Sequence, residues 1–257
     1  MKWLTIPLLC AATLLALPAR AASLQVAAAS DLTYTIGELT EAFRKQVPKA
    51  DIRYSIGSSG NFFAQIKQGA PFDVFLSADL MYPRRLAHEG AADAASLRTY
   101  AIGRLAVWSL DARLDVKQGM SVLRDPRVTR VAIANPAIAP YGRAARAALE
   151  VHGLWQAVGG KIVLGENIAQ TAQFIQTGNA QIGIVSYATV LAPRTKGVGS
   201  YYLVPEAGMA PIEQGAIITR RGMANPLAWR FMQFLQSDTA RVILRRHGFS
   251  MPPSSDA

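Results

Sequence analysis

The sequence predicts an α/β fold with parallel sheets, and three observations support this. Short apolar runs of strand length alternate with segments whose apolar residues recur at helical spacing. The runs are apolar at almost every position, as strands buried on both faces are. No internal repeat, low-complexity segment or long linker interrupts the alternation. Strands that alternate with helices in this way form βαβ units, and these build parallel sheets.

The first 21 residues stand outside this alternation. Lys2 supplies a positively charged start, residues 4–17 an apolar stretch, and Ala19–Arg20–Ala21 a small-x-small cleavage site. These features are typical of a secretory signal peptide, and the apolar stretch is too short for a membrane span. We therefore expect residues 1–21 to be removed during export.

The expected strands start with the run at 24–29 and are separated by turn residues such as Gly, Pro and Asn. Residues 99–109 form a long apolar run and are expected to be one strand. Trp108, Trp155 and Trp229 lie in apolar surroundings and are expected in the core. The strands are expected at residues 24–29, 51–56, 72–79, 99–109, 128–136, 162–164, 183–187, 201–204 and 215–219.

The expected helices have one apolar face each. In the first of them, Leu32, Ile36, Leu39 and Phe43 recur at helical spacing, and the helix ends before Pro48. Several of the later helices stop at a glycine, a residue favoured just after a helix. The helices are expected at residues 32–47, 61–68, 81–90, 142–152 and 168–177, and as two tail helices separated near Ser237–Asp238.

Composition excludes several functional classes. Loss of Lys2 and Arg20 lowers the formal net charge from +10 to +8 and leaves a chain without cysteine, because Cys10 is lost with them. The arginines are scattered without interleaved aromatic residues, so nucleic-acid binding is not expected. The three histidines are isolated, so no metal site is expected. The positive charge instead gives a general attraction for anions. The isolated histidines are His88, His152 and His247.

Four strand-to-helix junctions bring backbone N–H groups to helix starts. Parallel α/β sheets bind ligands beyond the carboxyl ends of their strands, and helix N-termini bind anions. Any one junction alone fits an ordinary capped helix start better than an anion site. The four together predict a site for a tetrahedral oxyanion. They are Ser30–Asp31, residues 57–60, residues 140–142 and residues 166–168.

The serine-rich junction at residues 57–60 has no known catalytic pattern. It has neither the spacing nor the final Lys–Ser/Thr pair of a phosphate-binding loop. Gly57–Ser58–Ser59–Gly60 also does not fit the G-x-S-x-G pattern of a nucleophile elbow. An enzyme is therefore not expected, and no catalytic residue is assigned.

The mature chain resembles, over essentially its full length, the periplasmic molybdate-binding proteins that supply ABC importers. Two of the matching segments, GAPFDVFLSAD and GENIAQT, are long enough to be specific. All the matching segments are AAASDL (27–32), GSSGNFFAQIKQGAPFDVFLSAD (57–79), TYAIGRLAVWS (99–109), ANPAIAPYG (134–142), GENIAQT (165–171) and RRHGF (245–249).

The resemblance implies a two-lobed type II periplasmic-binding-protein fold, with a mostly parallel sheet flanked by helices in each lobe. The ligand is expected in the cleft between the lobes, and two crossing strands act as the hinge. The first lobe is expected to comprise residues 22–102 and 211–257, and the second lobe residues 103–210.

The family's oxyanion ligands fall on four positions of this sequence. Ser30 and Ser59 are expected to offer their hydroxyl and backbone N–H groups, Tyr141 its N–H with its hydroxyl as a further candidate, and Ile168 its N–H. Some members of the family add a tyrosine ligand after the GIV segment. Ser186 stands at that place here and Tyr187 follows it; either of them or neither contributes, and strand alternation allows only one to face the cleft. The supporting turn residues are Gly57, Ser58, Gly60 and Asn167.

Asp31 is the residue that fits an oxyanion site least well. A carboxylate directed at a dianion would be repelled, so we expect Asp31 to offer only its N–H. Its side chain is then expected to turn to solvent or to cap residues 32–34. The alternative is that Asp31 accepts a proton from a protonated anion, which would favour hydrogen phosphate over molybdate.

The resulting expectation is a periplasmic receptor without a cofactor. It binds molybdate, and tungstate as well, and delivers the ion to an ABC permease. The alternative is a receptor for another tetrahedral oxyanion, sulfate or phosphate. The resemblance implies a monomer. Arg84 and Arg85 are candidates for permease docking, although ordinary solvated helix charge explains them equally well.

Overall fold

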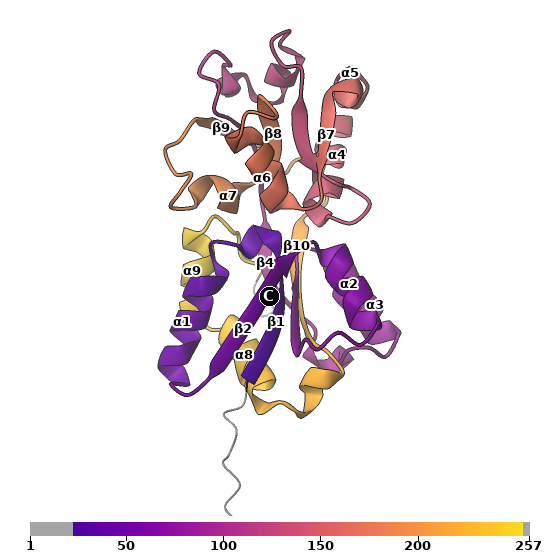
Figure 1. Ribbon diagram of the computed structural model, residues 1–257, viewed down its shortest axis with the longest axis vertical. Helices are drawn as coiled ribbons and strands as arrows, with labels where there is room; N and C mark the ends of the chain where they lie inside the picture. Colours follow the sequence, from indigo (N-terminus) through magenta and orange to yellow (C-terminus); the bar gives the residue numbers. More distant parts are fainter. Residues whose placement is uncertain (1–22, 254–257) are drawn as a thin grey trace, which may run out of the picture.

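The computed structural model describes residues 23–253, so the predicted signal peptide lies outside the described residues. The described chain forms two lobes, and each contains a five-stranded mixed sheet flanked by helices (Figure 1). The expected α/β fold is thus confirmed, and four strands of each sheet run in the same direction.

The sheet of the first lobe contains the N-terminal strands and one strand that returns from late in the chain. Its order is β2-β1-β3-β10-β4. β1 pairs in parallel with β2 and β3, and β10 lies antiparallel between β3 and β4. The strands are β1 (Ser23–Ala29), β2 (Asp51–Gly57), β3 (Val74–Ser77), β4 (Arg98–Gly103) and β10 (Ile212–Ile218).

The sheet of the second lobe repeats this plan in the order β7-β6-β8-β5-β9. β6 pairs in parallel with β7 and β8, and β5 lies antiparallel between β8 and β9. The strands are β5 (Leu105–Ser109), β6 (Val131–Ala134), β7 (Ile162–Gly165), β8 (Ile182–Ser186) and β9 (Ser200–Leu203).

The single antiparallel strand of each sheet is the first strand after the chain crosses over from the other lobe. β5 follows β4 after Arg104, and β10 brings the chain back after β9. The expectation of one strand over residues 99–109 is therefore wrong, because β4 and β5 belong to different sheets. Both halves are largely apolar and buried, and only Gly103–Arg104 interrupts the run at the break.

Helices cover both faces of each sheet, and several begin at a capping side chain. Ser58 caps α2, Asn167 caps α6 and Ser237 caps α9. The first lobe contains η1 (Ser30–Leu32), α1 (Ile36–Gln46), α2 (Ser59–Lys67), α3 (Met81–His88), η2 (Ala94–Ser96), η5 (Arg221–Ala224), α8 (Pro226–Leu235) and α9 (Asp238–Arg246). The second lobe contains η3 (Val116–Arg124), α4 (Pro140–Val151), α5 (Trp155–Val158), η4 (Gly159–Lys161), α6 (Ile168–Gln176) and α7 (Tyr187–Leu191).

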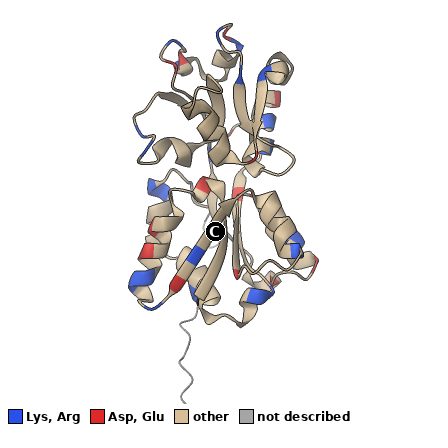
Figure 2. Cartoon of the chain, viewed as in Figure 1, with Lys and Arg blue, Asp and Glu red and all other residues tan. Residues whose placement is uncertain are grey.

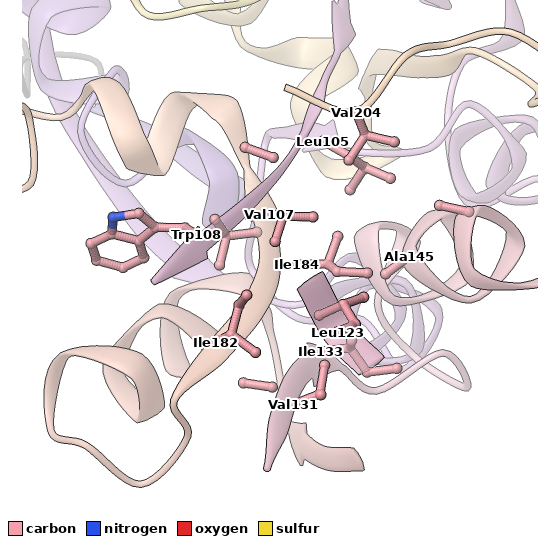
Figure 3. Packing of buried hydrophobic residues seen from close by; sticks show 14 of the residues in the cluster. Leu105, Val107, Trp108, Leu123, Val131, Ile133, Ala145, Ile182, Ile184 and Val204 are labelled. Carbon is pink, nitrogen blue, oxygen red and sulfur yellow. The ribbon is translucent and has the colours of Figure 1, made fainter. Parts of the chain in front are cut away.

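Each lobe has its own apolar core. In the second lobe, Trp108, Val131 and Ile184 pack with aliphatic residues from helices on both sides of the sheet (Figure 3). In the first lobe, the rings of Phe43, Phe231 and Phe234 pack together between α1 and α8. Trp229 is 39% exposed on α8, so its expected place in the core is wrong.

Charged side chains lie mainly on helices and loops. Figure 2 shows the Lys and Arg residues spread over both lobes rather than gathered on one face. Within residues 23–253, no helix is long and apolar enough to cross a membrane.

Candidate functional site

The four junctions predicted from the sequence meet where the two lobes touch. The Ile168 N–H donates to the Ser30 hydroxyl oxygen at 3.3 Å, which joins the first and fourth junctions. The Gly60 N–H donates to the Ile138 carbonyl at 3.0 Å, which joins the second junction to the loop before the third. Helix starts from both lobes therefore face one another, as binding at the ends of parallel strands requires.

The first pair to meet is Ser30 and Ile168. Ser30 begins η1 at the end of β1, and Ile168 is the first residue of α6. The Asn167 side chain accepts from the N–H groups of Ala169 and Gln170. This cap leaves the Ile168 N–H free to point across the contact between the lobes, where the Ser30 hydroxyl accepts it. Asn167 thus caps α6 at the fourth junction.

The two serines of the second junction make different contacts. The Ser58 hydroxyl oxygen accepts from the Asn61 N–H at 3.3 Å and caps α2. The Ser59 hydroxyl oxygen accepts from the Ala78 N–H at 3.0 Å, just beyond β3. A hydroxyl that accepts one bond still has a proton to donate. Ser59 is 1% exposed, so a ligand that accepts this proton would meet it in a water-poor site.

Glycines let the backbones approach at this junction. A Cβ on Gly60 would lie 2.7 Å from the Ile138 carbonyl oxygen of the opposite lobe. A Cβ on Gly57 would lie 3.0 Å from the ring of Phe62. The Gly60 position therefore admits only glycine without a shift of the lobe contact.

Tyr141 lies in the first turn of α4, directly after Pro140. Backbone N–H groups in a first turn have no acceptor earlier in the helix, so the Tyr141 N–H is one of the free donors at the start of α4, the end of a helix that suits an anion. Its hydroxyl lies elsewhere, buried beside Asp31 and Gln214, where it has no hydrogen-bond partner of good geometry.

Ser186 and Tyr187 form contacts of other kinds. The Ser186 side chain caps α7, accepting from the Thr189 N–H at 3.2 Å, and shares a 2.8 Å hydrogen bond with the Thr189 hydroxyl. The Tyr187 hydroxyl lies 3.5 Å from that of Tyr201, and its ring stands beneath the Arg104 guanidinium. Among the described contacts, neither side chain bonds to the four junctions.

The expectation for the Asp31 side chain is wrong. The side chain is 2% exposed rather than solvated, and η1 has no side-chain cap. Neither carboxylate oxygen has a hydrogen-bond partner of good geometry. Burial raises the pKa of Asp31 from 3.8 to about 7, although the Tyr141 hydroxyl, the N–H groups of Asp31 and Leu32, and the Gln214 amide all act to lower it.

Two polar contacts across the lobes were not anticipated from the sequence. The Asn61 amide donates to Glu166 at 2.7 Å, and Arg143 pairs with Asp79 while donating to the Tyr82 hydroxyl at 3.2 Å. These partners are more than sixty residues apart in the chain. Only the proximity of the GENIAQT and PYGR segments to the junctions could have suggested them.

The described residues hold no cluster of His, Cys, Asp and Glu that could bind a metal ion. The donors at the junctions are neutral hydroxyl and N–H groups. Such groups suit an oxyanion, whose oxygens accept hydrogen bonds, rather than a cation.

Comparisons with known proteins place the chain in a family of binding proteins. A family model described as bacterial extracellular solute-binding protein matches residues 24–250. The molybdate-binding protein ModA of Rhodobacter capsulatus is 39% identical over 236 residues, covering 91% of each chain. ModA of Azotobacter vinelandii is 38% identical over 240 residues, covering 93% of this chain and 94% of the relative.

Solved structures of binding proteins also match this chain. The periplasmic molybdate-binding protein of Azotobacter vinelandii matches with a TM-score of 0.84 and 35% identity, over 89% of this chain and 99% of that one. The sulfate-binding protein SubI of Mycobacterium tuberculosis matches with a TM-score of 0.73 and 15% identity, over 91% of this chain and 88% of that one. This second match shows a shared fold.

Proposed function

The chain belongs to the bacterial extracellular solute-binding protein family, and from this premise we propose that it binds molybdate and delivers it to an ABC transporter permease. The family is one of binding proteins rather than enzymes. The observation that carries the proposal is the meeting of four helix starts from both lobes, with the Ser30 hydroxyl joined to the Ile168 N–H across the cleft. Relatives named for molybdate binding support the choice of ion.

The proposed ligands are neutral donors. Ser30 and Ser59 would supply hydroxyl and N–H groups, and Tyr141 and Ile168 would supply N–H groups. An anion oxygen between the lobes would replace the bond that now joins Ser30 to Ile168. Helix starts would then stabilise the charge without a buried cation. The caps formed by Ser58 and Asn167 would hold two of these helix starts in position.

Ser186 and Tyr187 stay outside the proposed set of direct ligands. Ser186 already bonds Thr189 twice. Tyr187 instead packs against Gly248 of the first lobe. Its ring lies so close that a Cβ on this glycine would be 2.9 Å from it. Its proposed part is therefore to hold α7 against the first lobe.

Tungstate would bind as well, because it carries the same charge in a tetrahedral shape. Sulfate is also a dianion but is smaller. In a pocket built on rigid helix starts, its oxygens would fall short of some donors. Each missed hydrogen bond in a buried site costs about 1–3 kcal/mol.

We further propose a periplasmic location for the mature protein and the lobe boundaries 22–102 with 211–257, and 103–210. Sheet membership supports these boundaries, since β1–β4 and β10 share one sheet and β5–β9 the other. A single chain contributes every junction, which is consistent with a monomeric receptor. Arg84 and Arg85 are exposed on α3 and remain candidates for permease contact.

Isothermal titration of residues 22–257 with molybdate, tungstate, sulfate and phosphate tests the function. We expect one-to-one binding of molybdate and tungstate, with sulfate much weaker. Ser59→Ala should weaken molybdate binding by about tenfold or more, because a buried donor is lost. Ser121→Ala is the matched control, since its hydroxyl bonds only the exposed Gln118 carbonyl. Phosphate binding in place of molybdate, or no anion binding at all, would overturn the proposal.

A further inference from the structure

A buried polar cluster with unused hydrogen-bonding capacity lies directly behind the proposed site. Both carboxylate oxygens of Asp31, the Tyr141 hydroxyl and the Gln214 amide nitrogen are buried without a partner of good geometry. Buried polar groups are nearly always paired, so three such groups in one place call for an explanation. Asp31 follows the proposed ligand Ser30 directly in the chain.

The cluster sits where the chain crosses between the lobes. A Cβ on Gly103, at the end of β4, would lie 2.7 Å from the Gln214 amide nitrogen and would also collide with the Tyr141 hydroxyl. Tyr100 on β4 donates to the Gln214 carbonyl oxygen at 3.3 Å. Asp31, which lies in η1 of the first lobe, is thus surrounded by α4 of the second lobe and by the crossing strands β4 and β10.

No cation faces the Asp31 carboxyl from the described elements around it. The titratable groups beside it are the Tyr100 and Tyr141 hydroxyls, and Gln214 is neutral. α6 carries no titratable residue. The end of β2 that lies next to η1 consists of Ser55, Ile56 and Gly57, which carry no charge. α7 brings only Tyr187, which bonds Tyr201.

The Asp31 carboxylate and a bound oxyanion would compete for the same donors. The N–H groups of Asp31 and Leu32 lie close to this carboxylate and act to keep it charged. These N–H groups also belong to the helix start at which the anion is proposed to bind. Two like charges on one set of donors, without a cation between them, are strongly unfavourable in a buried site.

We infer that Asp31 holds a proton whenever the dianion is bound, so that the receptor captures molybdate and one proton together. This inference rests on the proposed function. The proton comes from solvent and adds to a carboxylate oxygen, with no other bond made or broken. The neutral carboxyl then has an O–H to donate and no longer repels the anion. Asp31 becomes a residue that sets the affinity through its protonation.

The direction of the pH effect follows from the state of Asp31 without the anion. Burial sets the pKa of this carboxyl at about 7, and a neighbouring dianion would raise it further. Well below pH 7 the group is protonated before and after binding, so affinity does not change with pH. Above pH 7 binding must take up a proton, and Kd rises by up to about tenfold per pH unit.

Titration calorimetry between about pH 6 and about pH 8.5 tests this linkage, with molybdate as the ligand. For the unmodified chain, we expect a flat Kd at the acidic end and a rising Kd above neutrality. At about pH 8, two buffers of different ionisation enthalpy should reveal uptake of about one proton per anion. This measurement needs no variant and therefore does not depend on whether a substituted chain folds.

Asp31→Asn should bind molybdate with a Kd that does not change over this range and should exceed the unmodified chain in affinity at the alkaline end. Asp111→Asn is the matched control, because this carboxyl pairs with Arg113 at 2.7 Å, away from the site, and its loss should leave the pH profile unchanged. A pH-independent Kd with no proton uptake in the unmodified chain would overturn the inference alone. An unchanged pH profile in Asp31→Asn would also overturn it. Absence of molybdate binding at every pH would instead remove the proposed function.

Discussion

At the scale of single residues, the site depends on close backbone approach as much as on donor groups. The Gly60 N–H reaches the Ile138 carbonyl of the other lobe because Gly60 has no side chain. A Cβ on Gly60 would also lie 2.9 Å from the Tyr82 hydroxyl. Any side chain at this position must push the two lobes apart.

Gly60→Ala should therefore weaken molybdate binding while leaving each lobe folded. Overpacking at a tight contact costs about 1–3 kcal/mol, which corresponds to roughly a tenfold loss of affinity or more. Titration calorimetry measures the loss, and a thermal melt checks the fold. Gly159→Ala is the matched control, because a Cβ there meets nothing within 4 Å. Equal affinities for the two variants would show that the contact does not affect closure.

Asp31 shows why some residue-level predictions fail. An aspartate at a helix start is usually solvated, and the local sequence offers nothing to suggest otherwise. Its burial arises from Tyr141 and Gln214, which lie more than a hundred residues away in the chain. Asn61 and Glu166 are similarly distant partners. Local pattern predicts which residues stand at a junction but not which long-range neighbours enclose them.

At the scale of elements, the sequence predicts the strand-to-helix order and most of the cap positions well. Hydrophobic period and capping residues are local properties, so β1, α6 and the two tail helices lie close to where they were expected. The expectation of one strand over residues 99–109 missed the break between β4 and β5, although Gly103–Arg104 interrupts the apolar run there and the expected lobe boundary after residue 102 falls beside it. Sheet membership there depends on pairing with β10 and β8, which are distant in sequence.

Asn167→Ala should reduce both stability and molybdate affinity. Loss of a helix cap costs about 1 kcal/mol, and the Ile168 N–H would lose its fixed direction. Chemical denaturation and titration calorimetry measure the two effects. Ser237→Ala removes a comparable cap from α9, away from the junctions, and should lower stability without lowering affinity. If both variants bound molybdate as the unmodified chain does, the α6 start would not be a ligand.

At the scale of the whole molecule, the lobes are held together by polar contacts around the junctions. Arg143 of α4 pairs with Asp79, which follows β3, and also donates to Tyr82 of α3. The pair is partly shielded, with about a third of Arg143 and a quarter of Asp79 exposed. It lies beside the site rather than in it, so it can favour the closed arrangement without touching the anion.

Arg143→Ala should therefore speed molybdate release more than it slows capture. A partly shielded ion pair contributes about 1 kcal/mol, which corresponds to roughly a fivefold faster dissociation rate. Stopped-flow measurement of binding and release separates the two rates. Arg127→Ala is the matched control, because Arg127 pairs with Asp125 at 2.5 Å within the second lobe and should change neither rate. The double variant with Asp79→Ala should release molybdate no faster than Arg143→Ala, since the ion pair is already lost in the single variant. Additive losses, or a slower capture with unchanged release, would mean that the pair guides the anion into the cleft and does not hold the lobes together.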